Sequence, residues 1–255
     1  MLTTGVAAQL YTLREFLTTP QDIATTLKRV KAMGYNAVQL SGVGPIAPQA
    51  LADILHGEGL LAIITHVSFD RLQNDLPALL AEHALWGCPN IAIGGLPGEY
   101  RSEQGYADFA KLASQVALRL KDAGYTFSYH NHSFEFEKYN GKTGWDILFA
   151  NAVPEVLSEL DTYWVQHGGA NPVTRIRQMS GRITVIHLKD MGNVDGQQVM
   201  AEVGEGNLEW PQILAASRDA GVKWYAVEQD VCRRDPFESL AISLRNLRAL
   251  GVEDR

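Results

Sequence analysis

The chain has 255 residues, 46% of them hydrophobic, and a formal net charge of −7 with a pI near 5.5. This length and apolar content suffice for a large hydrophobic core, and the acidic balance argues against a nucleic-acid backbone or an anionic membrane as the main partner. The two cysteines are far apart, no basic-then-apolar leader opens the chain, and no segment reaches the roughly 20 apolar residues that cross a bilayer, so the sequence predicts a cytoplasmic protein.

Strand patterns alternate with helix patterns along the whole chain. Short apolar runs predict eight strands, over Gly5–Leu13, Asn36–Val43, Leu61–Phe69, Asn90–Ile93, Thr126–His132, Val156–Asp161, Ile183–Asp190 and Trp224–Asp230. Apolar residues at helical spacing, often followed by glycine, predict a helix after each strand, over about Pro20–Met33, Pro48–His56, Leu76–Leu85, Tyr106–Ala123, Trp145–Ala150, Pro172–Met179, Trp210–Ala220 and Pro236–Leu250.

Eight strand–helix units in about 250 residues are the size and count of a closed (β/α)₈ barrel. Strands that alternate with helices pair in parallel, because each crossover needs a helix. The rival is an open doubly wound sheet, which usually has a glycine-rich phosphate loop after its first strand. Here Leu10–Glu15 reads LYTLRE and contains no glycine. The sequence therefore favours a single-domain (β/α)₈ TIM barrel over residues 1–255.

Each of the last four predicted strands ends in polar residues. In such a barrel the active site lies at the carboxyl ends of the strands, and alternate residues of a strand face the same side. The residues concerned are His130 and His132 with Glu135 beyond them, then Glu159 and Asp161, His187 and Lys189, and Glu228 and Asp230. Asp161, His187, Glu228 and one ligand from the fifth strand would suit a divalent ion such as Mn²⁺, Mg²⁺, Co²⁺ or Zn²⁺.

Each of these residues also has an ordinary structural explanation. Asp161 alone could be a helix N-cap, and His187 alone could be a hydrogen-bonded core histidine. Glu228 is harder to explain in this way, because a carboxylate that ends a buried strand needs a partner. Their position on consecutive strands favours metal binding. His56 and His83 fall on helices and are predicted to lie on the surface.

Three further residues have alternative roles. Lys189 could neutralise developing oxyanion charge, or form a structural ion pair with Asp190 or Glu205. Trp164 could stack on a sugar ring or pack in the core, and His167, in a predicted loop, could contact substrate or solvent. Around the same mouth, the earlier strands place further candidates for substrate binding: Gln9, Arg14 and His66.

The sequence resembles the sugar phosphate isomerase/epimerase superfamily of xylose isomerase-like TIM barrels over essentially its whole length. The matching pieces are AQLYTLR (Ala8–Arg14), YHNHSFEF (Tyr129–Phe136), LDTYWVQHGG (Leu160–Gly169), GRITVIHLKD (Gly181–Asp190), VGEGNLEW (Val203–Trp210) and VEQD (Val227–Asp230). The resemblance implies one divalent ion held by Glu, Asp, His and Glu from the last four strands. In this chain, the Asp, the His and the second Glu of that set correspond to Asp161, His187 and Glu228.

The first glutamate of that set has no direct counterpart in this chain. Relatives often place it at the position of His130 or Tyr129. Glu135 folding back is the favoured replacement, and His130 or His132 acting as the ligand is the alternative. If a histidine stands there, the acid/base pair becomes Glu228 with an imidazole, His130 or His132, which suits one-way elimination at least as well as epimerisation.

The resemblance implies a metal-dependent isomerase or epimerase that removes a proton next to a carbonyl of a free sugar, keto-sugar or cyclitol, through an enediolate. A dehydratase or lyase on a keto-sugar, keto-glycoside or inosose is the close alternative. An apurinic-endonuclease-like phosphodiesterase is disfavoured by the acidic charge and the few rim histidines, and a catalytically silent binding protein by the nearly complete ligand set. No phosphate cradle or arginine cluster is visible. The expected partner is a small sugar or cyclitol, without nucleic acid or membrane, and a homo-oligomer is left open.

Overall fold

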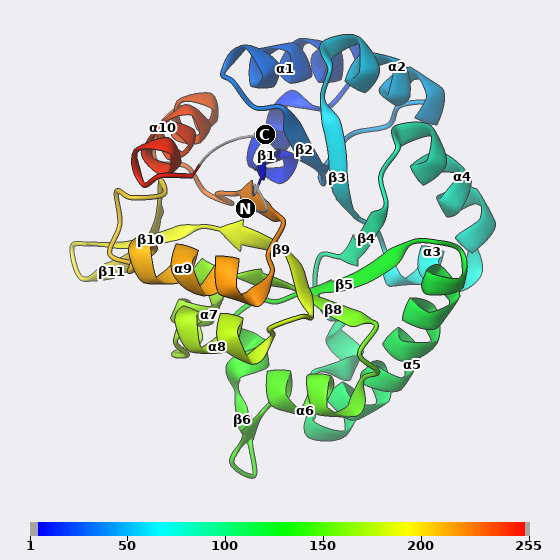
Figure 1. Cartoon of the computed structure of the whole chain (residues 1–255), viewed down its shortest axis with the longest axis vertical. Coiled ribbons are helices and arrows are strands. Elements are labelled where there is room, and N and C mark those ends of the chain that lie inside the picture. Colours follow the sequence, from blue (N-terminus) through cyan, green and yellow to red (C-terminus); the bar gives the residue numbers. More distant parts are fainter. Residues whose placement is uncertain (1–4, 253–255) are drawn as a thin grey trace.

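Eight parallel strands close into a barrel in the computed structural model, which describes residues 5–252 (Figure 1). The strands are β1 (Gly5–Gln9), β2 (Ala37–Leu40), β3 (Leu61–His66), β4 (Asn90–Ile93), β5 (Thr126–His130), β8 (Val156–Asp161), β9 (Ile183–Leu188) and β12 (Trp224–Val227). Their order around the barrel is β1-β12-β9-β8-β5-β4-β3-β2, so strands that follow one another in the chain are neighbours. The predicted fold class is confirmed.

The eight predicted helices are present and surround the barrel (Figure 1). They are α1 (Pro20–Ala32), α2 (Pro48–Glu58), α4 (Leu76–Trp86), α5 (Glu103–Asp122), α6 (Gly144–Asn151), α8 (Pro172–Gln178), α9 (Trp210–Ala220) and α10 (Pro236–Ala249). Proline in the first turn begins several of them, where its missing N–H costs no hydrogen bond. The main apolar core lies between these helices and the strands.

The first strand is shorter than predicted. It ends at Gln9 rather than Leu13, and a 3₁₀ helix follows over Leu10–Phe16. The cause is local: the side-chain oxygen of Gln9 accepts a hydrogen bond from the backbone N–H of Tyr11 at 2.6 Å and begins the turn. Arg14 therefore lies in a helical turn above the barrel wall.

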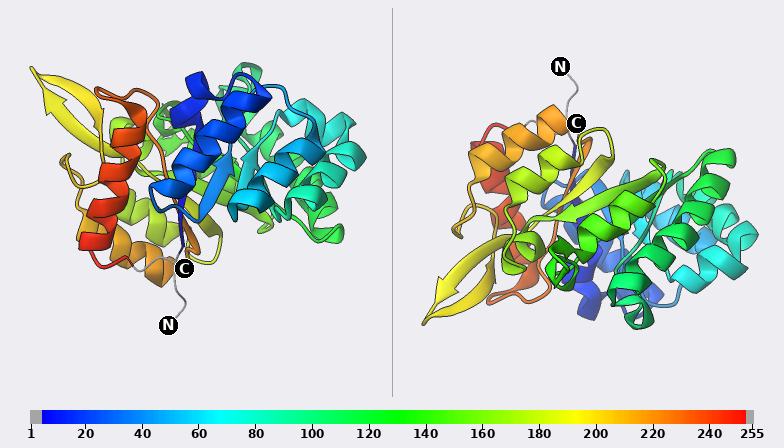
Figure 2. Two further views of the ribbon diagram at one scale, coloured as in Figure 1. Left: turned by 90° about the horizontal axis from the view of Figure 1, so that it is seen from above. Right: turned by 90° about the horizontal axis from the view of Figure 1, so that it is seen from below.

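Several short elements were not predicted. Helix α3 (Phe69–Asn74) follows β3 after two intervening residues, and helix α7 (Thr162–His167) follows β8 directly; each begins at a side-chain N-cap. Two antiparallel hairpins, β6–β7 (Lys138–Tyr139, Lys142–Thr143) and β10–β11 (Asp190–Val194, Gln197–Ala201), leave the barrel after β5 and β9. Figure 2 shows β10–β11, in yellow, projecting from the body of the molecule. Asn140 and Asp195 adopt φ angles of 50° and 52° before a glycine, the sequence signal of a tight hairpin turn.

The barrel interior has an apolar floor beneath a polar layer. On four strands a small apolar residue is followed two positions later by a buried polar one, and alternation places both on the inner face. The pairs are Ala7 and Gln9, Ala37 and Gln39, Val185 and His187, and Ala226 and Glu228. The floor excludes water from below, and the polar layer presents its side chains toward the carboxyl ends of the strands.

The prediction that His83 lies on the surface is wrong. Its side chain is fully buried between Thr65 Oγ1 and the backbone oxygen of Leu79, both 2.7 Å from a ring nitrogen. Burial lowers the pKa of His83, so the ring is neutral near pH 7. His56 is exposed, as predicted.

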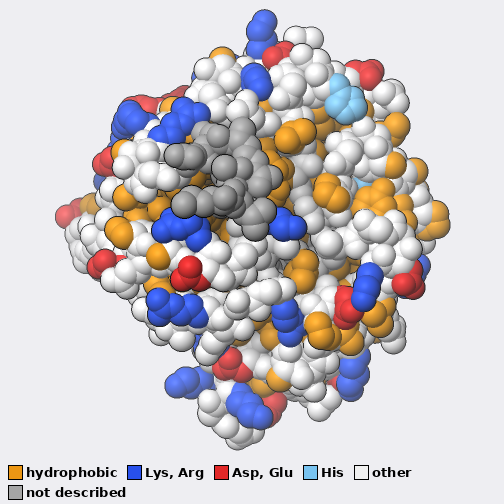
Figure 3. Space-filling model, in the orientation of Figure 1, with side chains coloured by type: hydrophobic (Ala, Val, Ile, Leu, Met, Phe, Trp, Pro, Cys, Tyr) orange, Lys and Arg blue, Asp and Glu red, His pale blue; other side chains and the backbone are white. Residues whose placement is uncertain are grey.

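Acidic and basic side chains are interspersed on the face shown in Figure 3. Within residues 5–252, no helix combines the length and the apolar character needed to span a bilayer.

Candidate metal centre and active site

The ends of four consecutive barrel strands bring the central candidate residues together. His130 ends β5, Asp161 ends β8, His187 lies in β9, and Glu228 follows β12 directly. One ligand atom from each of these residues lies within 4.8 Å of all the others, and all four side chains are buried. The predicted convergence on one rim is therefore present. We call these four residues the outer cluster.

His187 is the middle of the outer cluster. Its Nδ1 lies 2.9 Å from Oε2 of Glu228 and 3.8 Å from Oδ2 of Asp161. Asp161 is held in turn, because its backbone N–H donates to Asn131 Oδ1 and its Oδ1 caps helix α7 at the N–H of Trp164. Asp161 is therefore the N-cap of α7, the structural role that the sequence also allowed. Its second carboxylate oxygen, Oδ2, still faces His187.

Lys189 lies against the carboxylates of this site. Its Nζ is 3.0 Å from Oδ2 of Asp161, 2.8 Å from Oε2 of Glu228 and 2.7 Å from Oδ2 of Asp230. Burial alone would lower the pKa of Lys189, but the three carboxylates outweigh it and hold the pKa well above its usual range. The side chain is therefore a buried cation at the site.

The alternative ion-pair partners predicted for Lys189 are wrong. Asp190 instead accepts hydrogen bonds from the backbone N–H groups of Gly204, Gly206 and Leu208 and from the indole of Trp210, which fixes the segment after the β10–β11 hairpin. Glu205 bonds to Asn246. Lys189 therefore forms its ion pairs at the barrel mouth rather than with Asp190 or Glu205.

The outer cluster fits a divalent cation. Nδ1 of His130 and Oδ2 of Asp161 are buried and make no hydrogen bond, although the Lys189 ammonium is close to the latter. Buried polar atoms normally have partners, and a cation would supply one for both. Two carboxylates with two imidazoles suit Mn²⁺, Co²⁺ or Zn²⁺.

The charge states of the cluster agree with this donor set. Burial lowers the pKa of His130 far below its usual value, with nearby histidines adding to the effect, so its ring is neutral and offers a lone pair. Burial would raise the pKa of Glu228, but Lys189 and His187 outweigh it and keep the carboxyl ionised. Burial would lower the pKa of His187, but Glu159 and Glu228 raise it, so a cation at Nδ1 must displace a proton from this ring.

The structure does not place Glu135 in this cluster, against the favoured prediction that it folds back to complete the metal shell. The 3₁₀ turn Phe134–Phe136 directs its carboxylate onto its own segment, where Tyr129 Oη donates at 2.6 Å and the His132 backbone N–H at 2.9 Å. Burial raises the pKa of Glu135 to about 7. Among the fifth-strand candidates, His130 holds the position facing the outer cluster.

His132 and Trp164 form a wall beside the outer cluster. The rings of His130 and His132 are 5.1 Å apart and perpendicular, and the ring of Trp164 is 5.3 Å from that of His132. Burial lowers the pKa of His132 to about 4. Its Nδ1 and the indole Nε1 of Trp164 are both buried without a hydrogen-bond partner. Both side chains thus present an unused polar atom near the mouth.

The remaining predicted contacts divide into two groups. Gln9 and His66 belong to the buried network: Gln9 Nε2 donates to Glu228 Oε1 at 2.6 Å, and His66 Nε2 lies 2.6 Å from Glu159 Oε2. Arg14 and His167 stay outside the cluster. Arg14 stacks on Tyr11 and lines a cavity of about 290 Å³ that also includes Asp230. His167 is exposed at the end of α7, stacked on Tyr163.

Sequence reasoning gave no role to several residues that shape the site. Gln39 is fully buried, and its Oε1 lies 2.8 Å from Nε2 of His187. The sequence places Glu159 and Asp230 on the inner face but assigns no function to them. The only available signal for Gln39 was a polar residue inside an apolar strand.

Comparison with known proteins places this barrel among enzymes of related fold. Residues 78–250 match the family model described as xylose isomerase-like TIM barrel. Comparison with curated proteins finds no match. A sugar phosphate isomerase/epimerase from Parabacteroides distasonis superimposes with a TM-score of 0.80 at 22% identity, over 98% of this chain and 94% of that one.

Two further structures of similar fold are enzymes named for two different reactions. An L-ribulose 3-epimerase has a TM-score of 0.73 at 17% identity, covering 98% of this chain and 95% of its own. A probable 3-DHS dehydratase from Bacillus anthracis has a TM-score of 0.71 at 14% identity, covering 96% and 99%. At these identities the similarity shows the shared fold.

Proposed function

Because the chain belongs to the xylose isomerase-like TIM-barrel family, we propose that it is a divalent-metal-dependent isomerase or epimerase of a free sugar, keto-sugar or cyclitol. The observation that carries this proposal is the outer cluster, with His130 Nδ1 buried and without a hydrogen bond and Asp161 Oδ2 paired only with charged groups, at the end of the barrel where such sites form. His130, Asp161, His187 and Glu228 would hold the ion. When bound, it would stabilise the negative charge that develops on the substrate carbonyl oxygen.

Glu228 is the general base of the proposed step. It is ionised, lies at the rim, and is oriented by Gln9 and Lys189. It would remove the proton from the carbon next to the carbonyl and so form the enediolate. A base placed in this way contributes roughly 10²–10⁴-fold to the rate.

Lys189 and His132 complete the proton and charge transfers. The buried ammonium of Lys189 would offset the negative charge that develops on the enediolate, an electrostatic interaction that burial strengthens. His132 is neutral, and its Nδ1 makes no other hydrogen bond, so it is the second acid/base at the mouth. Trp164 gives this side an aromatic wall on which a sugar ring can stack.

A dehydratase or lyase is the second candidate, favoured by His130 at the fifth-strand position. His132 beside Glu228 could pass the proton that Glu228 removes to a departing hydroxyl or alkoxide, so that the enediolate eliminates instead of being reprotonated, while His130 would act as a ligand of the ion. The similarity to a probable 3-DHS dehydratase supports the same reading. Loss of a β-substituent distinguishes it from epimerisation.

A substrate panel tests the proposal. The protein is incubated with keto-sugars, 3-keto-glycosides and inososes, with Mn²⁺ or after chelation, and the products are identified by NMR. An epimer or positional isomer formed only with metal supports the first function, and an unsaturated product supports the second. Cleavage of DNA at apurinic sites, or turnover unaffected by chelation, contradicts both.

A further inference from the structure

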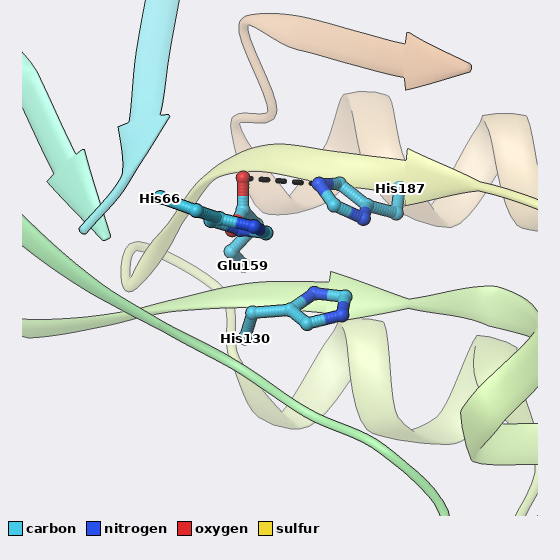
Figure 4. A group of neighbouring side chains, drawn as sticks. All are labelled: His66, His130, Glu159 and His187. Carbon is cyan, nitrogen blue, oxygen red and sulfur yellow. Dashed lines mark hydrogen bonds and ion pairs between the residues drawn. The ribbon is translucent and has the colours of Figure 1, made fainter. Parts of the chain in front are cut away.

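Beneath the outer cluster lies a second buried group, formed by Gln39, His66 and Glu159. Gln39 and Glu159 are fully buried, and the His66 side chain retains 12% exposure. Figure 4 shows Glu159 pointing at His187, with His66 against the carboxylate and His130 on the other side. We call Gln39, His66 and Glu159 the inner group.

The inner group contacts the side of His187 that faces away from Asp161 and Glu228. Nε2 of His187 lies 2.8 Å from Oε1 of Gln39 and 3.1 Å from Oε1 of Glu159. The other carboxylate oxygen, Oε2 of Glu159, lies 2.6 Å from Nε2 of His66. Oε1 of Glu159 has no directed hydrogen bond, so Gln39 receives the N–H of His187 and Glu159 supplies the negative charge beside it.

The spacing in the inner group is that of hydrogen bonds. His66, His130, Glu159 and His187 also offer ligand atoms within 4.8 Å of one another. Two ligands of one tetrahedral zinc ion, each about 2.0 Å from the metal, lie about 3.3 Å apart. The 2.6 Å between His66 and Glu159 is shorter and equals a charge-assisted hydrogen bond. A second cation is therefore not needed to explain this group.

We infer that Gln39 and Glu159 are positioning residues for the metal ligand His187. They hold Nε2 in its protonated form, which leaves the lone pair on Nδ1 and directs it toward Asp161 and Glu228. This inference rests on the proposed metal site. Partners of this kind fix the tautomer and the orientation of a metal-binding histidine, and their loss typically weakens metal binding 10–100-fold.

A paired arrangement on the first two strands supports the inference. Gln9 and Gln39 are register partners on β1 and β2. Gln9 uses the N–H end of its amide to donate to the carboxylate of Glu228, whereas Gln39 uses the carbonyl end to accept from His187. A carboxylate that binds a metal can accept a hydrogen bond, and Gln9 donates one to Glu228. An imidazole that binds a metal through one nitrogen can donate from the other, and Gln39 accepts from His187.

The test measures binding of Mn²⁺ alone by isothermal titration calorimetry. Glu159→Gln and Gln39→Met keep the side-chain size and are each expected to raise the dissociation constant 10–100-fold. Ser158→Ala is the matched control: it is the next residue on β8, equally buried, and its hydroxyl makes no hydrogen bond, so binding should change less than twofold. Circular dichroism verifies folding, and if one variant does not fold the other carries the test.

Two backgrounds separate positioning from general loosening of the barrel. Asp161→Asn and His187→Ala are expected to lose tight binding, so their residual weak binding is measured at millimolar Mn²⁺. In Asp161→Asn, Glu159→Gln should weaken this residual binding further by its full factor, because His187 is still present. In His187→Ala, the same change should have no further effect. Equal additional losses in both backgrounds, or wild-type affinity in both single variants, overturn the inference while leaving the metal site intact. Absence of Mn²⁺ binding to the wild-type protein refutes the inference together with the metal site that the proposed function requires.

Discussion

Nδ1 of His187, in β9, and Oε2 of Glu228, directly after the paired strand β12, face each other at 2.9 Å. Glu228 also contacts Lys189 at 2.8 Å and Gln9 at 2.6 Å, so a single carboxylate joins a candidate metal ligand, a buried ammonium and an amide. This relationship puts the proposed base beside the atoms that would bind the cation. The predictions below follow from it and from the packing around it.

The first prediction concerns the three ligands shared by sequence and structure. Asp161→Asn, His187→Ala and Glu228→Gln should each abolish the tight binding of one equivalent of Mn²⁺, because each removes one of the four donor residues of the outer cluster. Calorimetric titration measures it. Retention of a full equivalent at unchanged affinity in all three variants would exclude the site.

The second prediction separates the two fifth-strand candidates. His130→Ala should weaken Mn²⁺ binding at least tenfold, because one ring nitrogen of His130 lies within 4.8 Å of the other ligand atoms of the outer cluster. Glu135→Gln should leave the affinity unchanged within about twofold, since its carboxylate bonds to Tyr129 and to the backbone of His132. The same titration decides between them, and the reverse pattern would restore Glu135 as the ligand.

The third prediction concerns the buried ammonium. Lys189→Met should lower the free energy of unfolding by about 3–5 kcal/mol, because it leaves buried carboxylates without their counter-charge. Urea unfolding of the metal-free protein measures this change. Lys223→Met, at an exposed position before β12, is the control and should change it by less than about 0.5 kcal/mol. Equal effects would show that Lys189 is not the counter-charge.

The fourth prediction concerns pH and His83, which is remote from the proposed ligands in sequence. Its pKa is lowered in the folded state, so between that value and 6.5 the unfolded chain binds more protons. The His83 contribution to the free energy of unfolding should therefore be fully present above pH 6.5. It should fall on acidification, at up to about 1.4 kcal/mol per pH unit.

Urea unfolding at pH 7.5 and 5.5 tests this, with His83→Gln as reference. The stability of the wild-type protein should decrease more than that of the variant as the pH is lowered. Parallel decreases would mean that His83 does not contribute.

The alternation of apolar and polar residues explains how much the sequence could predict. Strands and helices alternate clearly, so the number of strand–helix units predicts the barrel. The positions of Asp161, His187 and Glu228 at the ends of their strands predict that these residues converge. The position of Glu135 differs from the expected one because a short 3₁₀ turn, set by Tyr129 and the His132 backbone, decides where that side chain points. Periodicity carries no information about such a turn.

Other features of the structure were not predicted from the sequence, for different physical reasons. Gln39 depends on a contact between β2 and β9, which no local pattern encodes. The hairpin turns at Asn140-Gly141 and Asp195-Gly196 carry a local signal, an Asn or Asp before Gly, although neither hairpin is among the predicted elements. His83 has the spacing of a helix residue, and only the packing of Thr65 against it shows that it is buried.

Hydrogen exchange into the substrate tests the central claim most directly. The Mn²⁺-loaded protein is incubated in D₂O with a keto-sugar or inosose from the active panel, and deuterium at the carbon next to the carbonyl is followed by NMR. The proposed proton abstraction predicts deuterium incorporation that depends on the metal and is lost in Glu228→Gln, which removes both the proposed base and a proposed metal ligand. Turnover with no deuterium in substrate or product, or with exchange unchanged in Glu228→Gln, would contradict it.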